Sequence, residues 1–416
     1  MIKSLVSIAF GLLFALVSEA ATPFVVSRWE LPAGAAESWT REHRIGDKTG
    51  TGFLSFEGQA PRYRYSKNGS VSVSGIKAGD FFLLSAPVPV LDAGTEVDAS
   101  FYLSIDKAGG PEDWACEYFD GKKWQVFGSF TLKKYENPNE TCFVQTFPLR
   151  RKLKTGLLQV RARALEDAGD PEARVSVMPS PRYGAYLAAW PKSNGRLRVL
   201  ILGNSATYHG ASYLALTEIA HSQGKSLSIG INLKGGQTFG QHLKLERSLA
   251  AIAAGGYDAA ILQNHATAPC AYIKDPQKNA SVMEDSKALA AQVRQYSPSC
   301  RLIFELRWAM PKNDWYGYGS AEAFDAVLSE GTGRLAAGMG AEIAPHGRAF
   351  ALGREAGLPL YWKDDAHPSV FGAYLKACVN YLVLFGEPFT EDASDYGLDP
   401  SKAAKCRKTA SEIVLK

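Results

Sequence analysis

The chain has 416 residues, more than one ordinary hydrophobic core accommodates, which predicts at least two domains. Hydrophobic residues make up 46% of the chain and charged residues 21%, as in ordinary globular proteins. The 46 Lys and Arg residues nearly balance the 42 Asp and Glu residues, and the basic residues form no long runs. This charge pattern argues against a nucleic-acid partner.

Residues 1–20 have the pattern of an export signal. Lys3 supplies a positive start, residues 5–17 are almost wholly apolar, and Ser18 and Ala20 are the small residues that a signal peptidase reads. The apolar stretch is too short to cross a bilayer comfortably, which favours a cleaved signal over a membrane anchor. We therefore expect a mature chain that starts at Ala21 and is exported to the periplasm or the extracellular space.

Strand-like runs dominate residues 21–189. Turn signals separate these runs, and Asp120-Gly121 between two aromatic-rich runs indicates a hairpin. Helical periodicity is weak, so this part predicts an antiparallel β-sandwich domain of jelly-roll type. A segment rich in proline and glycine, Met178–Arg196, is the expected connection to the next domain. The strand-like runs are EVDASFYLSID, WACEYFDGKKWQVFGSF, ETCFVQTFPL and GLLQVRARAL.

Strands and helices alternate in the second domain, residues 190–416. Such alternation predicts a parallel sheet covered by helices on both faces. In such sheets the ligand site lies at the carboxyl ends of the strands. The expected strands are 197–202, 227–233, 259–262, 302–306 and 341–344, and the expected helices are 211–222, 241–254, 284–296, 321–337, 369–385 and 401–414.

Polar residues and glycines follow the first four of these strands, and an Asp-x-x-His sequence precedes the helix at 369. Serine hydrolysis needs a nucleophile, a base, an orienting carboxylate and donors for an oxyanion, and all are available at this predicted edge. Taken alone, the Asn and Ser after the first strand could equally be a turn and a helix cap. The segments are Gly203-Asn204-Ser205, Leu233–His242, Gln263-Asn264-His265, Arg307-Trp308 and Lys363–Ser369.

Four ordered segments resemble the motifs of SGNH hydrolases of the GDSL type. The resemblance covers about residues 197–388 and implies a flavodoxin-like, three-layer α/β/α domain. The phrase KGGQTFGQHL and the β-rich first half also resemble exported esterases from bacteria that feed on polysaccharides. The matching segments are Gly203-Asn204-Ser205, with Asn where Asp is usual, Gly236-Gln237-Thr238, Gln263-Asn264-His265 where Gly-x-Asn-Asp is usual, and Asp364-Asp365-Ala366-His367.

The resemblance implies a catalytic triad in which Ser205 attacks an ester, His367 is the base and Asp364 orients the imidazole. It implies no metal and no organic cofactor. The spacing agrees for the carboxylate, since residues three apart in a turn can share a face, which favours Asp364 over Asp365. The implied oxyanion donors are the N–H groups of Ser205 and Gly236 and one side chain from Gln263, Asn264 or His265, among which the altered third motif leaves the choice open.

Other residues have weaker signals. His209 lies near Ser205, but a base four residues along a helix start would point elsewhere. Aromatic residues after the fourth strand could stack on a sugar or could be packing, and the candidates for substrate binding are Arg307, Trp308 and Trp315. The even number of cysteines in an exported chain suggests disulfides between neighbours, namely Cys116–Cys142, Cys270–Cys300 and Cys378–Cys406.

The sequence thus predicts an exported serine esterase that hydrolyses short acyl esters, most plausibly acetyl esters, on carbohydrate. The β domain is a candidate carbohydrate-binding domain. The alternatives are another SGNH activity (lipase, lysophospholipase or thioesterase) and a carbohydrate-binding or O-acetyl-transferring protein on the same scaffold. The sequence argues against a nucleic-acid partner and does not indicate an oligomeric state.

Overall fold

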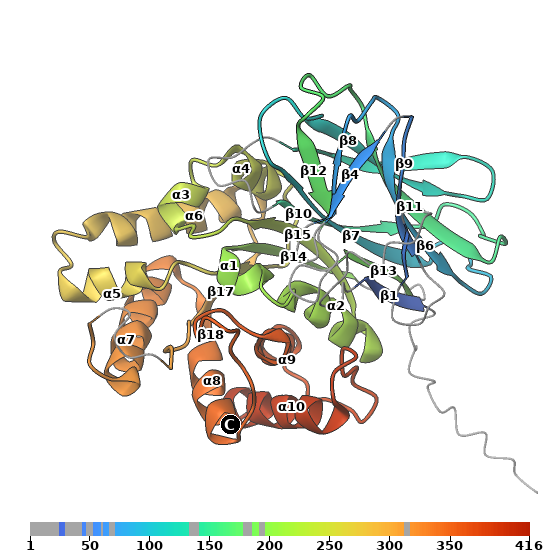
Figure 1. Ribbon diagram of the computed structural model, residues 1–416. Helices are drawn as coiled ribbons and strands as arrows, with labels where there is room; N and C mark the ends of the chain where they lie inside the picture. The colour runs from blue at the N-terminus through green and yellow to red at the C-terminus, as the bar shows by residue number, and fades with distance from the viewer. Residues whose placement is uncertain are drawn as a thin grey trace, which may run out of the picture.

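The computed structural model describes residues 25–29, 44–46, 53–59, 61–65, 71–132, 141–177, 185–190, 196–311 and 317–416. The predicted export signal and Trp315 lie outside the described residues. Within them the strands form three sheets, and the helices belong to the second half of the chain (Figure 1). None of the described helices combines the length and apolar character that crossing a bilayer requires.

Two antiparallel sheets make up the first half of the chain. One has the order β1-β13-β7-β12-β5-β4, with β10 also paired to β7, and the other has the order β2-β3-β6-β11-β8-β9. Side chains from both sheets share one buried core, for example Phe101 of β7 and Trp114 of β8. The strands are β1 Val25–Trp29, β2 Arg44–Gly46, β3 Phe53–Glu57, β4 Arg62–Tyr65, β5 Val71–Ser74, β6 Phe81–Pro87, β7 Glu96–Ile105, β8 Asp113–Phe119, β9 Trp124–Thr131, β10 Thr141–Pro148, β11 Leu157–Ala164, β12 Arg174–Val177 and β13 Ala185–Trp190.

The strand β13 lies inside the segment expected to be a connection. Its sequence AYLAAW pairs with β7 and β1, and residues 185–189 are buried. The prolines on both sides of this short apolar run predict turns, whereas the run itself forms a strand of the sheet. The first half therefore extends as a sheet almost to the start of the parallel sheet.

The second half contains a five-stranded parallel sheet, which confirms the predicted α/β class. Its order is β15-β14-β16-β17-β18, and all four strand pairs are parallel. In chain order this is 2-1-3-4-5, the order of flavodoxin-like doubly wound sheets. The strands are β14 Arg196–Gly203, β15 Ser226–Leu233, β16 Ala259–Leu262, β17 Arg301–Glu305 and β18 Glu342–Ala344.

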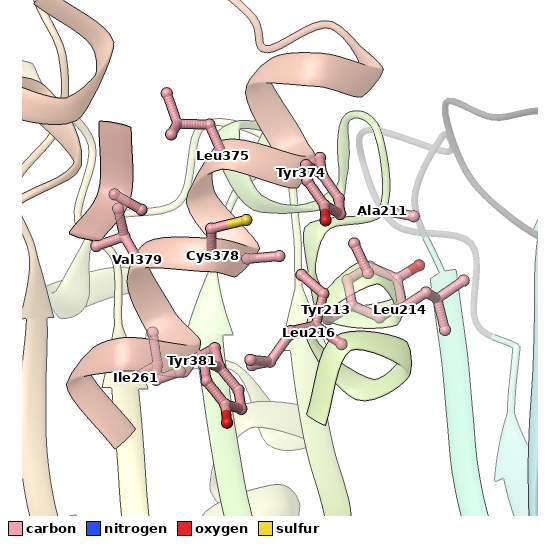
Figure 2. Packing of buried hydrophobic residues seen from close by; sticks show 14 of the residues in the cluster. Ala211, Tyr213, Leu214, Leu216, Ile261, Tyr374, Leu375, Cys378, Val379 and Tyr381 are labelled. Carbon is pink, nitrogen blue, oxygen red and sulfur yellow. The ribbon is translucent and has the colours of Figure 1, made fainter. Parts of the chain in front are cut away.

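Helices cover both faces of this sheet (Figure 1). Successive residues of β14 point to opposite faces, so that Ile201 packs against one set of helices and Leu202 against the other. On the first face, side chains of α2 (Ser212–Ser222) and α9 (Val370–Phe385) meet above Ile261 of β16 (Figure 2). The α10 helix (Pro400–Val414) packs outside α9. On the second face lie α3 (Phe239–His242), α4 (Glu246–Ala253), α6 (Ala280–Tyr296) and α7 (Ala321–Met339).

Four helices depart from expectation. The helix expected over 241–254 is two short helices, α3 and α4, because a capping box of Thr238 and Gln241 starts α3 earlier and its turn ends near Leu243. The helices α5 (Thr267–Lys274) and α8 (His346–Glu355) were not predicted. Both are short, and tertiary packing outweighs propensity in short helices.

Buried polar contacts join the antiparallel sheets to the parallel sheet. Glu96 of β7 accepts a hydrogen bond from Ser226 Oγ of β15 at 2.6 Å and one from Arg196 Nε of β14 at 3.1 Å. Tyr186 and Ala188 of β13 belong to the core that α2 and α9 form. The two halves of the chain therefore share part of one hydrophobic core.

The predicted disulfides are wrong. Cys116, Cys270, Cys300, Cys378 and Cys406 are free and buried, and the side chain of Cys142 lies outside the described residues. Cys116 is on β8, whereas Cys142 is on β10 of the other sheet.

Geometry separates Cys270 from Cys300. Cys270 packs against Leu306, beyond the carboxyl end of β17, whereas Cys300 precedes its amino end. A strand of this length places them about 20 Å apart, well beyond disulfide reach. Cys378 and Cys406 pack in the same core but are free thiols, and Cys406 Sγ faces the carbonyl oxygen of Phe371 at 3.9 Å.

Candidate active site

Ser205 is the first residue of the short helix α1 (Ser205–Tyr208), directly after the carboxyl end of β14. Asn204 caps this helix, since its Oδ1 accepts a hydrogen bond from the N–H of Ala206 at 3.1 Å. Between residues 199 and 222 every residue is buried except Ser205, which is partly exposed. The local fold thus presents this hydroxyl to solvent from a buried framework.

A row of hydrogen bonds joins Ser205, His367 and Asp364. Ser205 Oγ lies 2.8 Å from His367 Nε2, and His367 Nδ1 lies 2.6 Å from Asp364 Oδ2. Because Asp364 is an acceptor when ionised, Nδ1 carries the proton and Nε2 is left to accept from the serine hydroxyl. This is the arrangement in which a histidine can remove the proton of an attacking serine.

A tight loop between residues 361 and 369 holds the base. Trp362 N–H donates to the His367 carbonyl at 2.8 Å, and Asp364 Oδ1 accepts from the N–H groups of Ala366 and His367 at 3.1 and 3.0 Å. Asp365 has a left-handed backbone, with φ of 57°. The turn therefore brings the side chain of Asp364 back to the imidazole three residues later.

The carboxylate of Asp364 is held in its ionised form. Burial by itself would raise the pKa of Asp364, but the hydrogen bonds from the side chain and backbone of His367 and from Ala366 outweigh burial and lower this pKa to about 2. Asp364 is consequently charged at neutral pH. A charged carboxylate fixes the tautomer of His367 and would stabilise the imidazolium that forms when His367 takes a proton.

Gln263 is not available as an oxyanion donor, contrary to one of the predicted alternatives. It is 0% exposed, and its Oε1 accepts from Asn204 N–H at 2.8 Å and from Thr207 Oγ1 at 3.3 Å. Its Nε2 donates to the carbonyl oxygen of Asn264. Gln263 therefore ties the nucleophile turn to β16 from below.

Asn264 keeps its amide NH₂ group for a ligand. Its Oδ1 accepts from the N–H groups of Phe239 and His265 at 3.2 and 2.9 Å, which orients Nδ2 away from both. Nδ2 makes no hydrogen bond to the described part of the chain, and this nitrogen is not fully buried. Asn264 is 3% exposed, and an amide donor left open beside these loops can bind an anionic oxygen.

Two backbone groups complete the donor set. Among the described residues, the N–H groups of Ser205 and Gly236 find no acceptor. Gly236 is exposed and has a φ of 68°, so only a residue without a side chain adopts this turn easily. Asn204 Nδ2 donates to the carbonyl of Gln237 at 3.0 Å and so joins the serine turn to the glycine loop. An ionised Asp at position 204 could not make this bond.

Two of the remaining predicted residues, His265 and Arg307, are partly exposed in this region. His265 is half-buried, and its Nδ1 lies 2.7 Å from Thr267 Oγ1. Burial lowers the pKa of His265, and the charges of Arg307 and His367 lower it further. Arg307 is half-buried and therefore reaches the surface of this region.

Trp308 is not a sugar platform. It is 1% exposed, stacks on Phe350 with ring centroids 4.1 Å apart, and donates from Nε1 to the carbonyl of Ala366 at 3.0 Å. Its ring supports the loop that carries His367 from within the core. The prediction that it binds substrate is wrong because the helix α8, which the sequence did not reveal, covers it.

Sequence reasoning missed a buried ion pair behind the nucleophile. Lys376 Nζ on α9 lies 2.9 Å from Glu305 Oε2 at the end of β17 and donates to the carbonyl of Ala206 at 2.9 Å. Asn380 Nδ2 donates to the other oxygen of Glu305 at 3.3 Å. The signal was present, since Lys376 and Asn380 are polar residues four apart in an otherwise apolar helix.

Comparisons with known proteins give only structural neighbours. No protein-family model matches the chain, and no curated protein matches it. The solved structures that resemble it include a DUF4886 family protein from Bacteroides uniformis, with 19% identity and a TM-score of 0.44 over 53% of this chain and 95% of that chain.

Two further neighbours are named as esterases. A family two carbohydrate esterase from Cellvibrio japonicus has 11% identity and a TM-score of 0.32 over 80% of this chain and 94% of that chain. Axe2, an acetylxylan esterase from Geobacillus stearothermophilus, has 13% identity and a TM-score of 0.36 over 48% of this chain and 98% of that chain. At such low similarity, function has to be inferred from the residues of the site.

Proposed function

We propose that this chain is an exported serine esterase that removes short acyl groups, acetyl above all, from carbohydrate. The observation that carries the proposal is the row of hydrogen bonds from Ser205 Oγ through His367 to Asp364, at 2.8 and 2.6 Å. A partly exposed serine in an otherwise buried segment, bonded to an oriented imidazole, is the arrangement that activates a hydroxyl for attack.

In the proposed reaction, Ser205 Oγ attacks the carbonyl carbon of the ester while its proton passes to His367 Nε2. The tetrahedral intermediate then collapses, the bond to the alcohol oxygen breaks, and His367 returns the proton to that oxygen. Water repeats the sequence on the acyl-enzyme and releases the acid. Asp364 holds the imidazole in the required tautomer throughout. No step needs a metal or an organic cofactor.

The negative oxygen of the tetrahedral intermediate would be bound by three donors. These are the N–H groups of Ser205 and Gly236 and the Nδ2 of Asn264, which have no acceptor among the described residues. Donors aimed at a developing oxyanion each contribute about 10²–10³ in rate. Asn264 is thus our choice among the three candidates of the altered third motif.

The substrate class and the location come from the sequence. The phrase KGGQTFGQHL and the order of a β-rich part before an α/β part resemble exported polysaccharide esterases. We assign residues 21–189 to a jelly-roll-like β-sandwich domain and residues 190–416 to an SGNH hydrolase domain, after an export signal at 1–20. The two antiparallel sheets with a common core support the sandwich.

The test compares the wild-type protein with Ser205→Ala on acetyl and octanoyl esters of p-nitrophenol and on acetylated xylan. Ser205→Ala should lower hydrolysis by about three or more orders of magnitude, and Ser401→Ala, which changes an exposed serine of α10, should not. Activity of Ser205→Ala within about tenfold of the wild type would refute the proposal. Faster cleavage of octanoyl esters would indicate a lipase, and acetyl transfer to an added alcohol a transferase.

A further inference from the structure

The ring of His209 lies flat against the ring of His367. The two ring centroids are 4.0 Å apart, and the planes differ by 18°. His209 is only 3% exposed, so this contact belongs to the interior of the site and not to its rim. The opposite edges of the His367 ring already face Ser205 and Asp364. A ring stacked on its face therefore restrains the one remaining direction of motion.

The backbone fixes His209 relative to the nucleophile. His209 ends the short helix α1, and its N–H donates to the carbonyl of Ser205 at 3.0 Å. Gly210 and Ala211 follow with left-handed backbones, at φ of 73° and 54°. The single helical turn that carries the serine hydroxyl thus also fixes the position of the His209 ring relative to that hydroxyl.

The same backbone is fixed relative to the base. A Cβ atom on Gly210 would lie 2.5 Å from the Cβ of Ala373 and 2.9 Å from the carbonyl oxygen of Ser369, so the chain passes directly against the start of α9. Helix α9 begins only three residues after His367. His209 is consequently held against both segments that carry the reacting groups.

We propose that His209 is a positioning residue for the esterase reaction, an inference that rests on the proposed function. Its ring keeps the His367 imidazole in the plane in which Nε2 meets Ser205 and Nδ1 meets Asp364. When His367 takes the serine proton, the π electrons of the ring on its face also favour the new cation. His209 itself neither accepts the proton nor touches the ester.

The test uses two replacements of similar size, His209→Phe, which keeps a ring, and His209→Leu, which does not. The imidazole nitrogens are lost in both variants, so a difference between them reports stacking. His221→Leu, which removes another buried imidazole on α2, is the control for folding. The measurements are kcat and KM for p-nitrophenyl acetate and the rate at which a fluorophosphonate labels Ser205.

We expect His209→Leu to lower kcat and the labelling rate about tenfold with little change in KM, and His209→Phe to stay within about threefold of the wild type. The low-field proton resonance of His367 Nδ1–H should shift or broaden in His209→Leu and persist in His209→Phe. Equal rates for wild type and His209→Leu, or equal losses in both variants, would overturn the inference. A wild-type protein that neither reacts with the probe nor cleaves the ester would overturn the proposed function as well.

Discussion

Lys376 and Glu305 form an ion pair inside the core, with Nζ and Oε2 2.9 Å apart and side chains that are 0% and 1% exposed. Burial by itself would raise the pKa of Glu305, but the charges of Lys376 and His346 and the hydrogen bonds from Lys376 and Asn380 together outweigh burial and keep this pKa below its ordinary value. Lys376 also donates to the carbonyl of Ala206 in α1. The pair therefore connects β17 and α9 to the helix that carries Ser205.

Removing one member of this pair should destabilise the protein strongly. Lys376→Met leaves an unpaired buried carboxylate, which typically costs about 3–5 kcal/mol of unfolding free energy. Adding Glu305→Gln removes the uncompensated charge and should recover a large part of that loss. Urea denaturation of the wild type, the single variant and the double variant measures both effects. A single variant as stable as the wild type would show that the pair contributes nothing.

The two adjacent carboxylates of the catalytic loop should differ sharply in their effect on turnover. Asp364 accepts from His367 Nδ1, whereas Asp365 occupies the left-handed position of the turn. Asp364→Asn should lower kcat by up to about 10⁴, as loss of the orienting carboxylate does in a serine protease. Asp365→Asn is the matched control, since Asn adopts a left-handed backbone readily. Equal kcat values for the two variants would contradict the role given to Asp364.

Replacing the neighbouring amides Gln263 and Asn264 should have different effects, one on stability and the other on turnover. Asn264→Ala removes an amide donor that has no acceptor among the described residues and should lower kcat about 10²–10³-fold with little loss of stability. Gln263→Ala leaves the N–H of Asn204 without its buried acceptor, which typically costs about 1–3 kcal/mol of unfolding free energy. Kinetics and thermal denaturation of both variants test this. A normal kcat in Asn264→Ala would exclude it from the oxyanion site.

Acid should destabilise the protein partly through His346. Burial lowers the pKa of His346 to about 4, while an unfolded histidine titrates near 6.5. Because the unfolded state binds the proton more readily, the stability from His346 is fully present above pH 6.5 and is lost as the pH falls towards 4. Between pH 7 and pH 5 this loss is about 2 kcal/mol.

The variant His346→Gln measures that contribution. Its amide can still bond to Asn380, which lies 3.0 Å from His346 Nε2, but it does not titrate. Urea denaturation at pH 7 and pH 5 should show a smaller loss of stability in the variant than in the wild type. Identical losses in the two proteins would mean that His346 is not the group that takes up the proton.

Reducing agents should leave the stability of the folded protein unchanged. Five cysteines are free and buried, and burial raises the pKa values of Cys270 and Cys300 to about 11. Buried thiols with raised pKa values react slowly with thiol reagents. A chromogenic disulfide reagent should detect these thiols only after denaturation, and dithiothreitol should not shift the Tm. A Tm that falls in dithiothreitol would revive the disulfide prediction.

Local sequence was sufficient for the alternation of strands and helices and for the loop positions of the candidate site. Buried strands have short apolar runs, and parallel strands bring their carboxyl ends to one edge whatever the detailed packing. The sequence alone therefore predicts that Ser205, Asp364 and His367 lie close together. The turn around Asp364 could also be predicted from the local sequence, because residues 361–369 contain most of the hydrogen bonds that shape it.

Only the tertiary structure decided which side chains remain available for chemistry. Gln263 and Asn264 are adjacent amides, and what distinguishes them is that the N–H of Asn204, 59 residues away, occupies Gln263. Trp308 is covered by Phe350, the five cysteines with described side chains are free and buried, and His209 meets His367 across 158 positions of sequence. Such contacts depend on how distant elements pack, and no local period or spacing encodes them, because burial and hydrogen-bond partners are properties of the assembled core.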